Sequence, residues 1–362
     1  MPLFGPPARV RPYFGYRNQT RLVLSLRALR GAHPNWDGKS STFAKLKTML
    51  SHFASREVPD LSVTIETGAG ERQTQRAVAT TDHEGFIHFD LPLGHDCPLP
   101  ERSSWETVVL RWQSRDGAQE ETGYVLAPGR DQRLGVISDI DDTILETGAH
   151  DLRRNWRRVL AQMPGDRLPV PGAAQFYARL GGGSAGARMP ATHRPFFYVS
   201  SSPWNLFDYL IAFQTAHGLP HGPMLLRDWG FNRATLGASG HGAHKTAAIG
   251  SILDFYGNTR FALIGDSTQA DAIAYADAVA AHPDRVAGVL IRKAPGAPID
   301  ATEMAALDAI EAAGVPLWLG DRFDVRDDFL ATLGLDDHDT RQIASGAPEA
   351  CPASAPVHAK DA

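Results

Sequence analysis

The sequence contains few cysteines and no long apolar run. Its 362 residues include two cysteines, Cys97 and Cys351, which lie far apart along the chain. Such a pair forms neither a disulfide framework nor a CxxC metal site, and it suits a reducing compartment. No stretch approaches the roughly 20 apolar residues that span a bilayer, and the first residues lack the features of a secretory signal. We therefore expect a cytoplasmic protein, with any membrane contact at its periphery.

An excess of positive charge is also missing. Lysine and arginine total 36 against 41 aspartates and glutamates, which gives a formal net charge of −5 at pH 7. A chain with this balance has no overall attraction to phosphate backbones. We therefore expect no nucleic-acid partner, although a local basic patch is compatible with the composition. The oligomeric state stays open.

Up to about residue 129, the chain consists of short runs in which apolar and polar residues alternate. The clearest examples are residues 22–26, 61–65, 85–91 and 108–112. Runs of this kind, separated by polar turns, are typical of the antiparallel strands of a sandwich. We therefore predict an N-terminal β-sandwich-like domain over residues 1–130.

After Pro128 and Gly129 the pattern changes to solid apolar runs that alternate with helical periodicity. The runs at 134–138, 196–199 and 261–265 each end in polar residues, as expected for buried parallel strands. This rhythm predicts a doubly wound, Rossmann-like α/β domain over residues 131–336, with its active site at the carboxyl ends of the strands. Residues 337–362 are rich in alanine, proline and small polar residues, which predicts a disordered tail.

The motif Asp139-Ile140-Asp141-Asp142-Thr143 follows the first of these strands directly. A carboxylate at the end of a strand can attack an electrophile in line, so Asp139 is the candidate nucleophile. Asp141 lies two residues further on, where it can protonate the departing oxygen and later deprotonate the attacking water. The alternative is a solvated acidic turn. The strand context and three companion motifs argue against it.

The companion motifs occur in the order that a phosphoaspartate enzyme needs. The second strand ends in Ser200-Ser201-Ser202, whose hydroxyl and amide donors could hold a phosphoryl oxygen. Lys245 opens a helical pattern, where its ammonium could neutralise both the nucleophile and the phosphoryl group. The third strand ends at Asp266, which is placed to bind Mg²⁺, a cation that prefers oxygen ligands.

Together these motifs resemble the four motifs of haloacid dehalogenase superfamily phosphatases. More narrowly, residues 138–144, 198–204 and 263–267, with His244-Lys245, are similar to the App1-type phosphatidate phosphatases. The resemblance covers about residues 135–294. It implies a haloacid dehalogenase fold, dependence on Mg²⁺ and the conversion of phosphatidate to diacylglycerol. Ser201 is a departure, because many relatives carry asparagine there.

The resemblance also implies roles for single residues. Mg²⁺ would be bound by the side chains of Asp139 and Asp266 and by the backbone carbonyl of Asp141. Substrate would be bound by Thr143 and by the pair Ser200-Ser201. An aspartate at position 141, where P-type ATPases carry threonine, favours hydrolysis of the acyl phosphate. We expect like-charged Asp139 and Asp142 to raise the pKa of Asp141 and keep it protonated for the first half-reaction.

Several neighbouring residues have two interpretations each. Asp271 either braces the following helix or contacts the metal, and Arg227 either binds substrate or forms a buried ion pair. Asp142 is expected to be structural, binding loop amides. His241 and His244 have the spacing of a metal-binding pair but no third ligand nearby in sequence, so we expect no zinc site.

The segment Leu152–Met163 places apolar residues on one helical face and four arginines, Arg153, Arg154, Arg157 and Arg158, largely on the other. Such a helix could lie on an anionic membrane beside the active site. The more common alternative is a helix packed on the protein with a solvated basic face.

The intervals between the motifs bear on the substrate. Residues 144–195 and 203–244 must also supply core elements, so no large cap domain fits there. An open site suits a large or surface-bound substrate such as a phospholipid. Two rivals stay open: an uncapped phosphatase acting on phosphoprotein or nucleic-acid ends, and an inactive scaffold whose N-terminal sandwich binds a partner.

Overall fold

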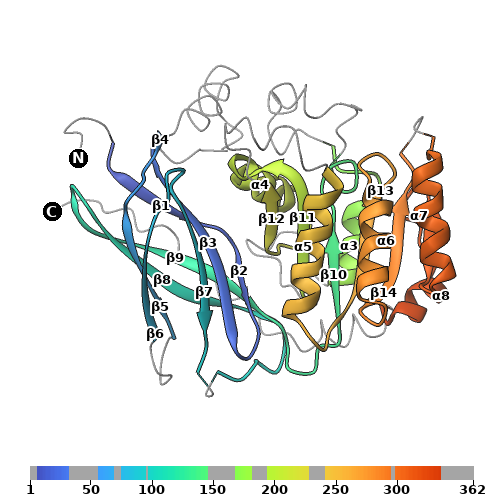
Figure 1. Cartoon of the computed structure of the whole chain (residues 1–362), viewed down its shortest axis with the longest axis horizontal. Coiled ribbons are helices and arrows are strands. Elements are labelled where there is room, and N and C mark those ends of the chain that lie inside the picture. The colour runs from blue at the N-terminus through green and yellow to red at the C-terminus, as the bar shows by residue number, and fades with distance from the viewer. Residues whose placement is uncertain are drawn as a thin grey trace.

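The protein is described here by a computed structural model that covers residues 6–31, 56–68, 75–94, 97–145, 168–181, 194–227, 241–294 and 298–335. Two sheets lie side by side in it. The described residues of the N-terminal half form one sheet, and the C-terminal half forms a second sheet flanked by helices (Figure 1).

The N-terminal sheet has nine strands and is antiparallel except where β2 pairs with β9. Its strands are β1 (Ala8–Pro12), β2 (Gly15–Arg17), β3 (Arg21–Arg30), β4 (Arg56–Glu57), β5 (Ser62–Thr67), β6 (Gln75–Thr80), β7 (Phe86–Pro92), β8 (Ser104–Ser114) and β9 (Gly117–Ala127). The order is β1-β3-β2-β9-β8-β5-β6, with β4 and β7 also paired to β3.

This sheet folds over its own core. Alternate residues of β3 (Leu22, Leu24 and Leu26) are buried in one cluster with Val63 and Ile65 of β5. Because β3 and β5 are separated by several strands in the sheet, both can face one core only if the sheet curls. The alternating pattern therefore produces the expected sandwich-like layer.

The C-terminal sheet is entirely parallel. Its strands are β10 (Leu134–Ser138), β11 (Phe196–Pro203), β12 (Met224–Arg227), β13 (Arg260–Asp266), β14 (Val286–Arg292) and β15 (Leu317–Gly320). The order is β12-β11-β10-β13-β14-β15. The chain reverses its direction of winding between β10 and β13, and ligands of such sheets bind in the crevice at that point.

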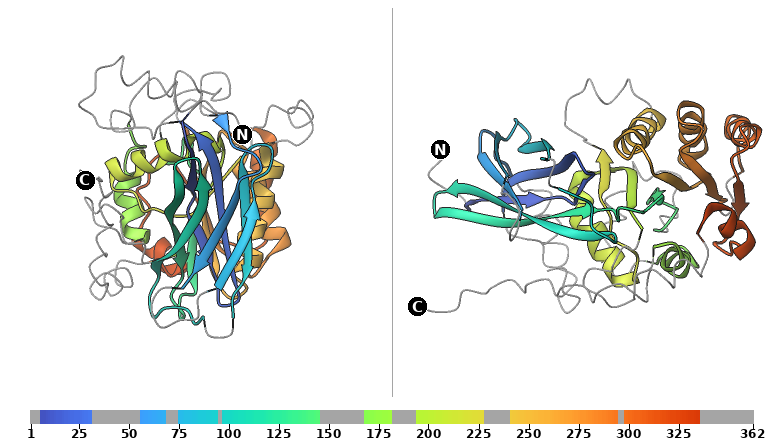
Figure 2. Two further views of the ribbon diagram at one scale, coloured as in Figure 1. Left: turned by 90° about the vertical axis from the view of Figure 1, so that its left-hand side faces the viewer. Right: turned by 90° about the horizontal axis from the view of Figure 1, so that it is seen from below.

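Helices cover both faces of the parallel sheet (Figure 2). One face carries α3 (Ala173–Gly181), the 3₁₀ turn η2 (Trp204–Leu206), α4 (Phe207–His217) and α8 (Asp327–Leu333). The other carries α5 (His241–Phe255), α6 (Asp271–Ala281) and α7 (Ala301–Ala312). The expected fold class, a parallel α/β domain preceded by a β-sandwich, is confirmed.

Aromatic side chains join the two halves. Tyr16 packs against Phe197 and Phe255, with ring centroids 5.4 and 4.9 Å apart. Tyr13 and Phe86 of the N-terminal half belong to the same buried cluster as the strands of the parallel sheet. The two sheets therefore share a continuous packed interface.

The sequence patterns locate the elements well, with one correction. The three apolar runs form β10, β11 and β13. Lys245 does not open its helix, because α5 already begins at His241. The proposed domain limits stay predictions, and both Leu152–Met163 and the tail 337–362 lie outside the described residues. Among the described helices, none has both the length and the apolar character needed to cross a membrane.

Candidate active site

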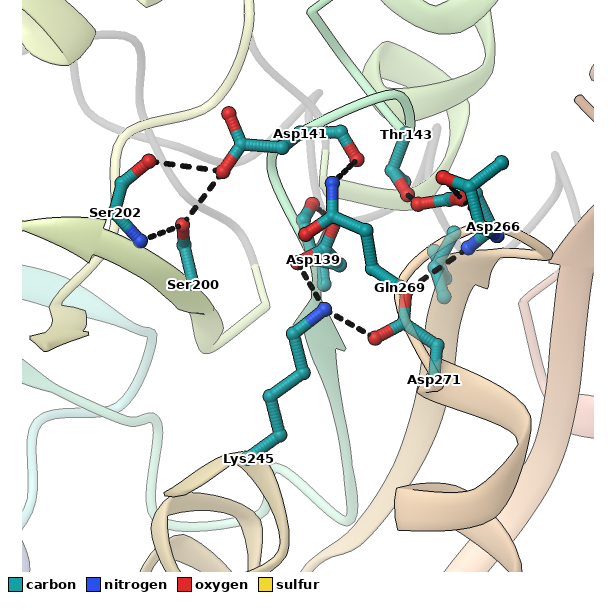
Figure 3. Close-up of polar contacts among 12 residues, drawn as sticks. Asp139, Asp141, Thr143, Ser200, Ser202, Lys245, Asp266, Gln269 and Asp271 are labelled. Atoms are coloured by element: carbon teal, nitrogen blue, oxygen red, sulfur yellow. Dashed lines mark hydrogen bonds and ion pairs between the residues drawn. The ribbon is translucent and has the colours of Figure 1, made fainter. Parts of the chain in front are cut away.

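Three adjacent strands of the parallel sheet, β11, β10 and β13, end at the same edge and bring the motif residues together (Figure 3). Asp139 follows β10, Ser200-Ser201-Ser202 form the last part of β11, and Asp266 ends β13. Lys245 reaches the same point from the second turn of α5. The site therefore lies at the switch point of the sheet.

Asp139 is buried and held on one side. Lys245 Nζ lies 2.7 Å from its Oδ1, and each side chain is 1% exposed. The backbone amide of Asp139 donates to the carbonyl of Ile264, 2.8 Å away on β13. Within the described residues, Oδ2 of Asp139 has no hydrogen-bond partner. A carboxylate oxygen left in this state is available to a metal or an electrophile.

Asp141 is clamped by two serines. Ser200 Oγ and Ser202 Oγ donate to its Oδ2 over 2.8 and 2.9 Å. Figure 3 shows its carboxylate turned toward these serines, on the side away from Asp266 and Asp271. Oδ1 therefore stays available to exchange a proton with a bound substrate.

Asp266 is held mainly through one of its oxygens. Its Oδ1 accepts from the backbone amide of Thr268 at 2.6 Å and from the hydroxyl of the same residue. The hydroxyl of Thr143 donates to Oδ2 over a longer 3.4 Å. Thr143 is fully buried, so the structure places it against a carboxylate. Its predicted contact with substrate stays a prediction.

Asp271, whose role the sequence left open, lies at the centre of the site. Its Oδ1 pairs with Lys245 Nζ, and its Oδ2 accepts from the backbone amide of Asp266 at 3.0 Å. Gly265 makes this approach possible, because a Cβ there would come within 2.5 Å of Asp271 Oδ2. Both oxygens of Asp271 are thus engaged, as expected of a brace.

The acidic residues fit a divalent cation. Asp139, Asp266 and Asp271 each offer an oxygen within 4.8 Å of the other two. Lys245 is the cation that pairs with two of these buried carboxylates, so negative charge remains in excess. Hard oxygen donors and uncompensated charge suit a divalent metal. Among these carboxylates within the described residues, Asp139 has an oxygen without a donor and Asp266 has one with only a long contact, whereas both oxygens of Asp271 are engaged.

Burial controls the protonation of the site. It raises the pKa of Asp139 well above its usual range, with Asp271 adding to the effect and Lys245 opposing it. Burial and then Asp271 raise the pKa of Asp266 to about 8. Burial alone would lower the pKa of Lys245, but the surrounding carboxylates outweigh it and raise the pKa. The site therefore holds protons until a cation replaces them.

The pKa of Asp141 is raised, as expected, but chiefly for another reason. Burial is the largest cause, the hydrogen bonds from Ser200 and Ser202 oppose it, and the charge of Asp142 adds a smaller effect. Like charge is therefore secondary, and Asp139 is not among the principal causes. The expectation had the right direction and the wrong principal cause.

Backbone strain and hydrogen bonds shape the two acidic loops. Asp142 and Ala270 have φ values of 57° and 59°, a left-handed conformation that is costly for residues other than glycine. Arg292 Nη1 donates to the carbonyl of Asp142 at 2.8 Å, and Gln269 Nε2 donates to that of Asp141 at 3.1 Å. The latter is the carbonyl predicted to bind Mg²⁺.

The sequence predicted neither a role for Gln269 and Arg292 nor the contact of Ser202 with Asp141. Ser202 lies inside the serine motif and Gln269 two residues beyond the motif at 263–267, yet the motifs do not say which side chain contacts which. Arg292 ends β14 and is 5% exposed. A charged residue at the end of an apolar run was the only available signal.

The other candidates lie around the site. Ser201 lies between the two clamping serines and is 9% exposed, and its predicted contact with substrate stays a prediction. Arg227 ends β12 and pairs in register with Pro203, at the same edge of the sheet. Burial lowers the pKa of His244, and among the described residues the metal-compatible group contains aspartates alone.

Comparisons with known proteins agree with this geometry. Residues 134–293 match the family described as "Phosphatidate phosphatase APP1, catalytic domain". Phosphatidate phosphatase APP1 of Saccharomyces cerevisiae is 30% identical over 250 residues, covering 68% of this chain and 40% of that protein. Residues 134–293 form an APP1-type catalytic domain. The match begins at β10 and ends just beyond β14, so this domain contains every site residue described above.

More distant relatives add little. An uncharacterized protein of Schizosaccharomyces pombe, C29B5.04c, is 26% identical over 216 residues, covering 59% of this chain and 34% of that protein. The chain thus spans less than half the length of either fungal relative. A solved β-glucuronidase of Bacteroides uniformis aligns with a TM-score of 0.26 and 8% identity, over 86% of this chain and 39% of that one. A similarity this low supports no argument.

Proposed function

We propose that the chain is a Mg²⁺-dependent phosphatase that converts phosphatidate to diacylglycerol through a phosphoaspartate on Asp139. One observation carries the proposal: Asp139 is buried with Lys245 on one oxygen and no hydrogen bond on the other within the described residues. A purely structural carboxylate at this depth would have both oxygens satisfied. The similarity to a phosphatidate phosphatase and the parallel sheet support the same reading.

In the first half-reaction, Asp139 Oδ2 attacks phosphorus and the bond from phosphorus to the lipid oxygen breaks. That oxygen takes the proton carried by Asp141, so diacylglycerol leaves as a neutral alcohol. The clamp of Ser200 and Ser202 on Oδ2 leaves Oδ1 of Asp141 as the oxygen that carries the proton. The raised pKa of Asp141 favours the protonated state that this step needs.

In the second half-reaction, Asp141 accepts a proton from a water molecule. The resulting hydroxide attacks phosphorus, the acyl phosphate bond breaks, and Asp139 regains its carboxylate as inorganic phosphate leaves. Asp141 ends protonated, ready for the next substrate. One aspartate therefore serves both halves of the cycle, as microscopic reversibility allows.

Charge stabilisation would come from a metal and from Lys245. Mg²⁺, when bound, offsets the charge on the phosphoryl oxygens, which is where most of the barrier lowering in phosphoryl transfer arises. Asp139, Asp266 and the backbone carbonyl of Asp141 would hold it. Lys245, 2.7 Å away, favours the ionised form of Asp139 and so opposes the larger effect of burial on its pKa.

The test is phosphate release by the purified full chain. The substrates are phosphatidate in mixed micelles, lysophosphatidate, a phosphopeptide, 3′- and 5′-phosphorylated oligonucleotides and a small aryl phosphate, each with Mg²⁺ or with chelator. Asp139→Asn serves as the blank. We expect metal-dependent turnover that is highest on phosphatidate and absent from the blank. If the protein turns over other substrates of the panel but not phosphatidate, the lipid substrate is disproved. If it turns over none of them, the phosphatase activity is disproved.

A further inference from the structure

The serine segment of β11 lies outside the regular pairing of the sheet. Pairing with β10 ends at Tyr198. Toward β12, Val199 pairs with Leu225 and Pro203 with Arg227, so four steps along β11 match two along β12. Ser200-Ser201-Ser202 therefore form a bulge. Bulges beside active sites change the direction of side chains, but they also interrupt the hydrogen bonds between strands that would hold the backbone in place.

The residues just after the bulge are held by the N-terminal sheet instead. Arg27 Nη1 on β3 donates to Asn205 Oδ1 at 2.6 Å. The ring of Tyr13 lies 4.4 Å from that of Trp204. Asp208, in the first turn of α4, pairs with Arg11 of β1. The segment 204–208 is thus fixed from outside the parallel sheet.

Arg27 is itself well placed to act as a rigid support. Its side chain is 11% exposed, and its guanidinium lies over the ring of Phe86, 4.6 Å from the centroid. Its Nε donates to the carbonyl of Glu84 at 3.0 Å, and its Nη2 lies 3.1 Å from Glu57 Oε1. A guanidinium with several partners loses little freedom for each additional hydrogen bond.

We propose that the N-terminal sheet is a positioning element of the catalytic site. Arg27 and Tyr13 fix Asn205 and Trp204, and these residues hold the bulge so that Ser200 and Ser202 orient Asp141. The proposal rests on the proposed function, because it assigns the purpose of the orientation to proton transfer by Asp141. It gives the N-terminal half a role in turnover that is separate from its contribution to stability.

The first test compares variants at Asn205, whose side-chain oxygen accepts the hydrogen bond from Arg27. Asn205→Leu removes the acceptor of Arg27 at similar volume, whereas Asn205→Asp keeps an acceptor there. We expect Asn205→Leu to lower kcat about 10-fold or more, since small misplacements of catalytic groups cost up to about 10²-fold. KM and the half-saturating Mg²⁺ concentration should change less than about twofold. Asn205→Asp should keep most of kcat.

A double-mutant cycle makes the assignment specific. Arg27→Ala should lower kcat like Asn205→Leu, and the combined variant should lose little more, because both changes break one link. Arg21→Ala is the matched control on the same strand. Arg21 pairs with Asp90 and lies over Phe255, 5.3 Å from its centroid, so it contacts the parallel domain at the end of α5 rather than at Asn205. Its kcat should equal that of wild type.

Hydrogen exchange provides a readout independent of turnover. In Asn205→Leu, peptides covering residues 199–206 should exchange faster, while peptides covering the end of β13 should exchange as in wild type. Local loosening together with lower kcat supports the proposal. Wild-type kcat in Asn205→Leu and Arg27→Ala overturns it, as does faster exchange throughout the chain. If the wild-type protein turns over no substrate, the proposed function fails. Exchange at residues 199–206 then tests the structural part separately: if it is unchanged in Asn205→Leu, Asn205 does not hold the bulge.

Discussion

At the scale of single residues, the site depends on one lysine among three carboxylates. Lys245 contacts Asp139 and Asp271, and all three side chains are essentially inaccessible to solvent. We expect Lys245→Met to abolish turnover and to lower the free energy of unfolding by roughly 3–5 kcal/mol, because it leaves buried charge without a partner. The loss should be smaller at pH 6 than at pH 8, since protonation then neutralises the carboxylates.

Chemical denaturation at the two pH values, beside the activity assay, measures these effects. Lys293→Met is the control, because Lys293 is 42% exposed and pairs with Asp321 over 3.2 Å at the surface. Ion pairs exposed at the surface in this way contribute little to the free energy of unfolding. Equal stability of Lys245→Met and wild type at pH 8 would contradict the charge balance described here.

Asp141→Asn separates the chemistry of the side chain from the metal contact of the backbone. The variant keeps the carbonyl expected to bind Mg²⁺ but cannot donate and accept the catalytic proton. We expect turnover to fall roughly 10²- to 10⁴-fold, with the Mg²⁺ affinity measured by calorimetry close to that of wild type. Unchanged turnover would remove Asp141 from its proposed role.

At the scale of elements, most of the fold and part of the site follow from the sequence. Apolar runs that end in polar residues located β10, β11 and β13, and parallel strands must bring those ends together. The particular contacts could not be predicted in this way. Ser202 reaches Asp141 because β11 bulges, and Asp271 reaches Asp266 because Gly265 leaves room for it. Both depend on backbone detail that residue patterns do not encode.

The loop before α6 offers a test of stored backbone strain. Ala270 adopts a φ of 59° at the N-cap of this helix, which costs a residue with a Cβ about 1–2 kcal/mol. Ala270→Gly relieves that strain but raises the conformational entropy of the unfolded chain, which opposes the gain. We therefore expect the free energy of unfolding to stay equal or rise by up to about 1 kcal/mol. Denaturant midpoints measure the change.

Ala274→Gly provides the comparison, since it lies in the same helix and is fully buried. There the substitution should lower stability by about 1 kcal/mol, because glycine is unfavourable inside a helix, and the lost methyl adds to the cost. If both variants lose the same amount of stability, the left-handed residue at position 270 carries no strain.

At the scale of the whole molecule, His221 makes the interface between the two halves sensitive to acid. Its ring lies 5.9 Å from that of Phe14, its side chain is 1% exposed, and burial lowers its pKa to about 4. The unfolded chain protonates its histidines near pH 6.5. Stability is therefore complete above that pH and is lost as the pH falls toward 4.

We expect the melting temperature of wild type to fall between pH 7 and pH 5, and that of His221→Gln to depend less steeply on pH, whatever its absolute value. His88→Gln is the control, because His88 is exposed and bonds Ser25 at the surface. An identical pH dependence in all three proteins would show that the buried imidazole does not contribute.

Metal binding should reverse the pH dependence of stability. Because the pKa of Asp266 is raised to about 8, the metal-free fold keeps a proton there that the unfolded chain releases near its ordinary pKa. In the metal-free protein the contribution of this carboxyl to stability is therefore greatest at low pH and is lost as the pH rises toward 8, opposite in sign to that of His221. A bound cation replaces that proton, so the stabilisation that it provides grows over the same range.

We expect the rise in melting temperature on adding Mg²⁺ to be larger at pH 8 than at pH 6, and Asp266→Asn to show little rise at either pH. An equal Mg²⁺ effect at both pH values in wild type would mean that the cation binds elsewhere, since a site on these carboxylates must release protons as it fills.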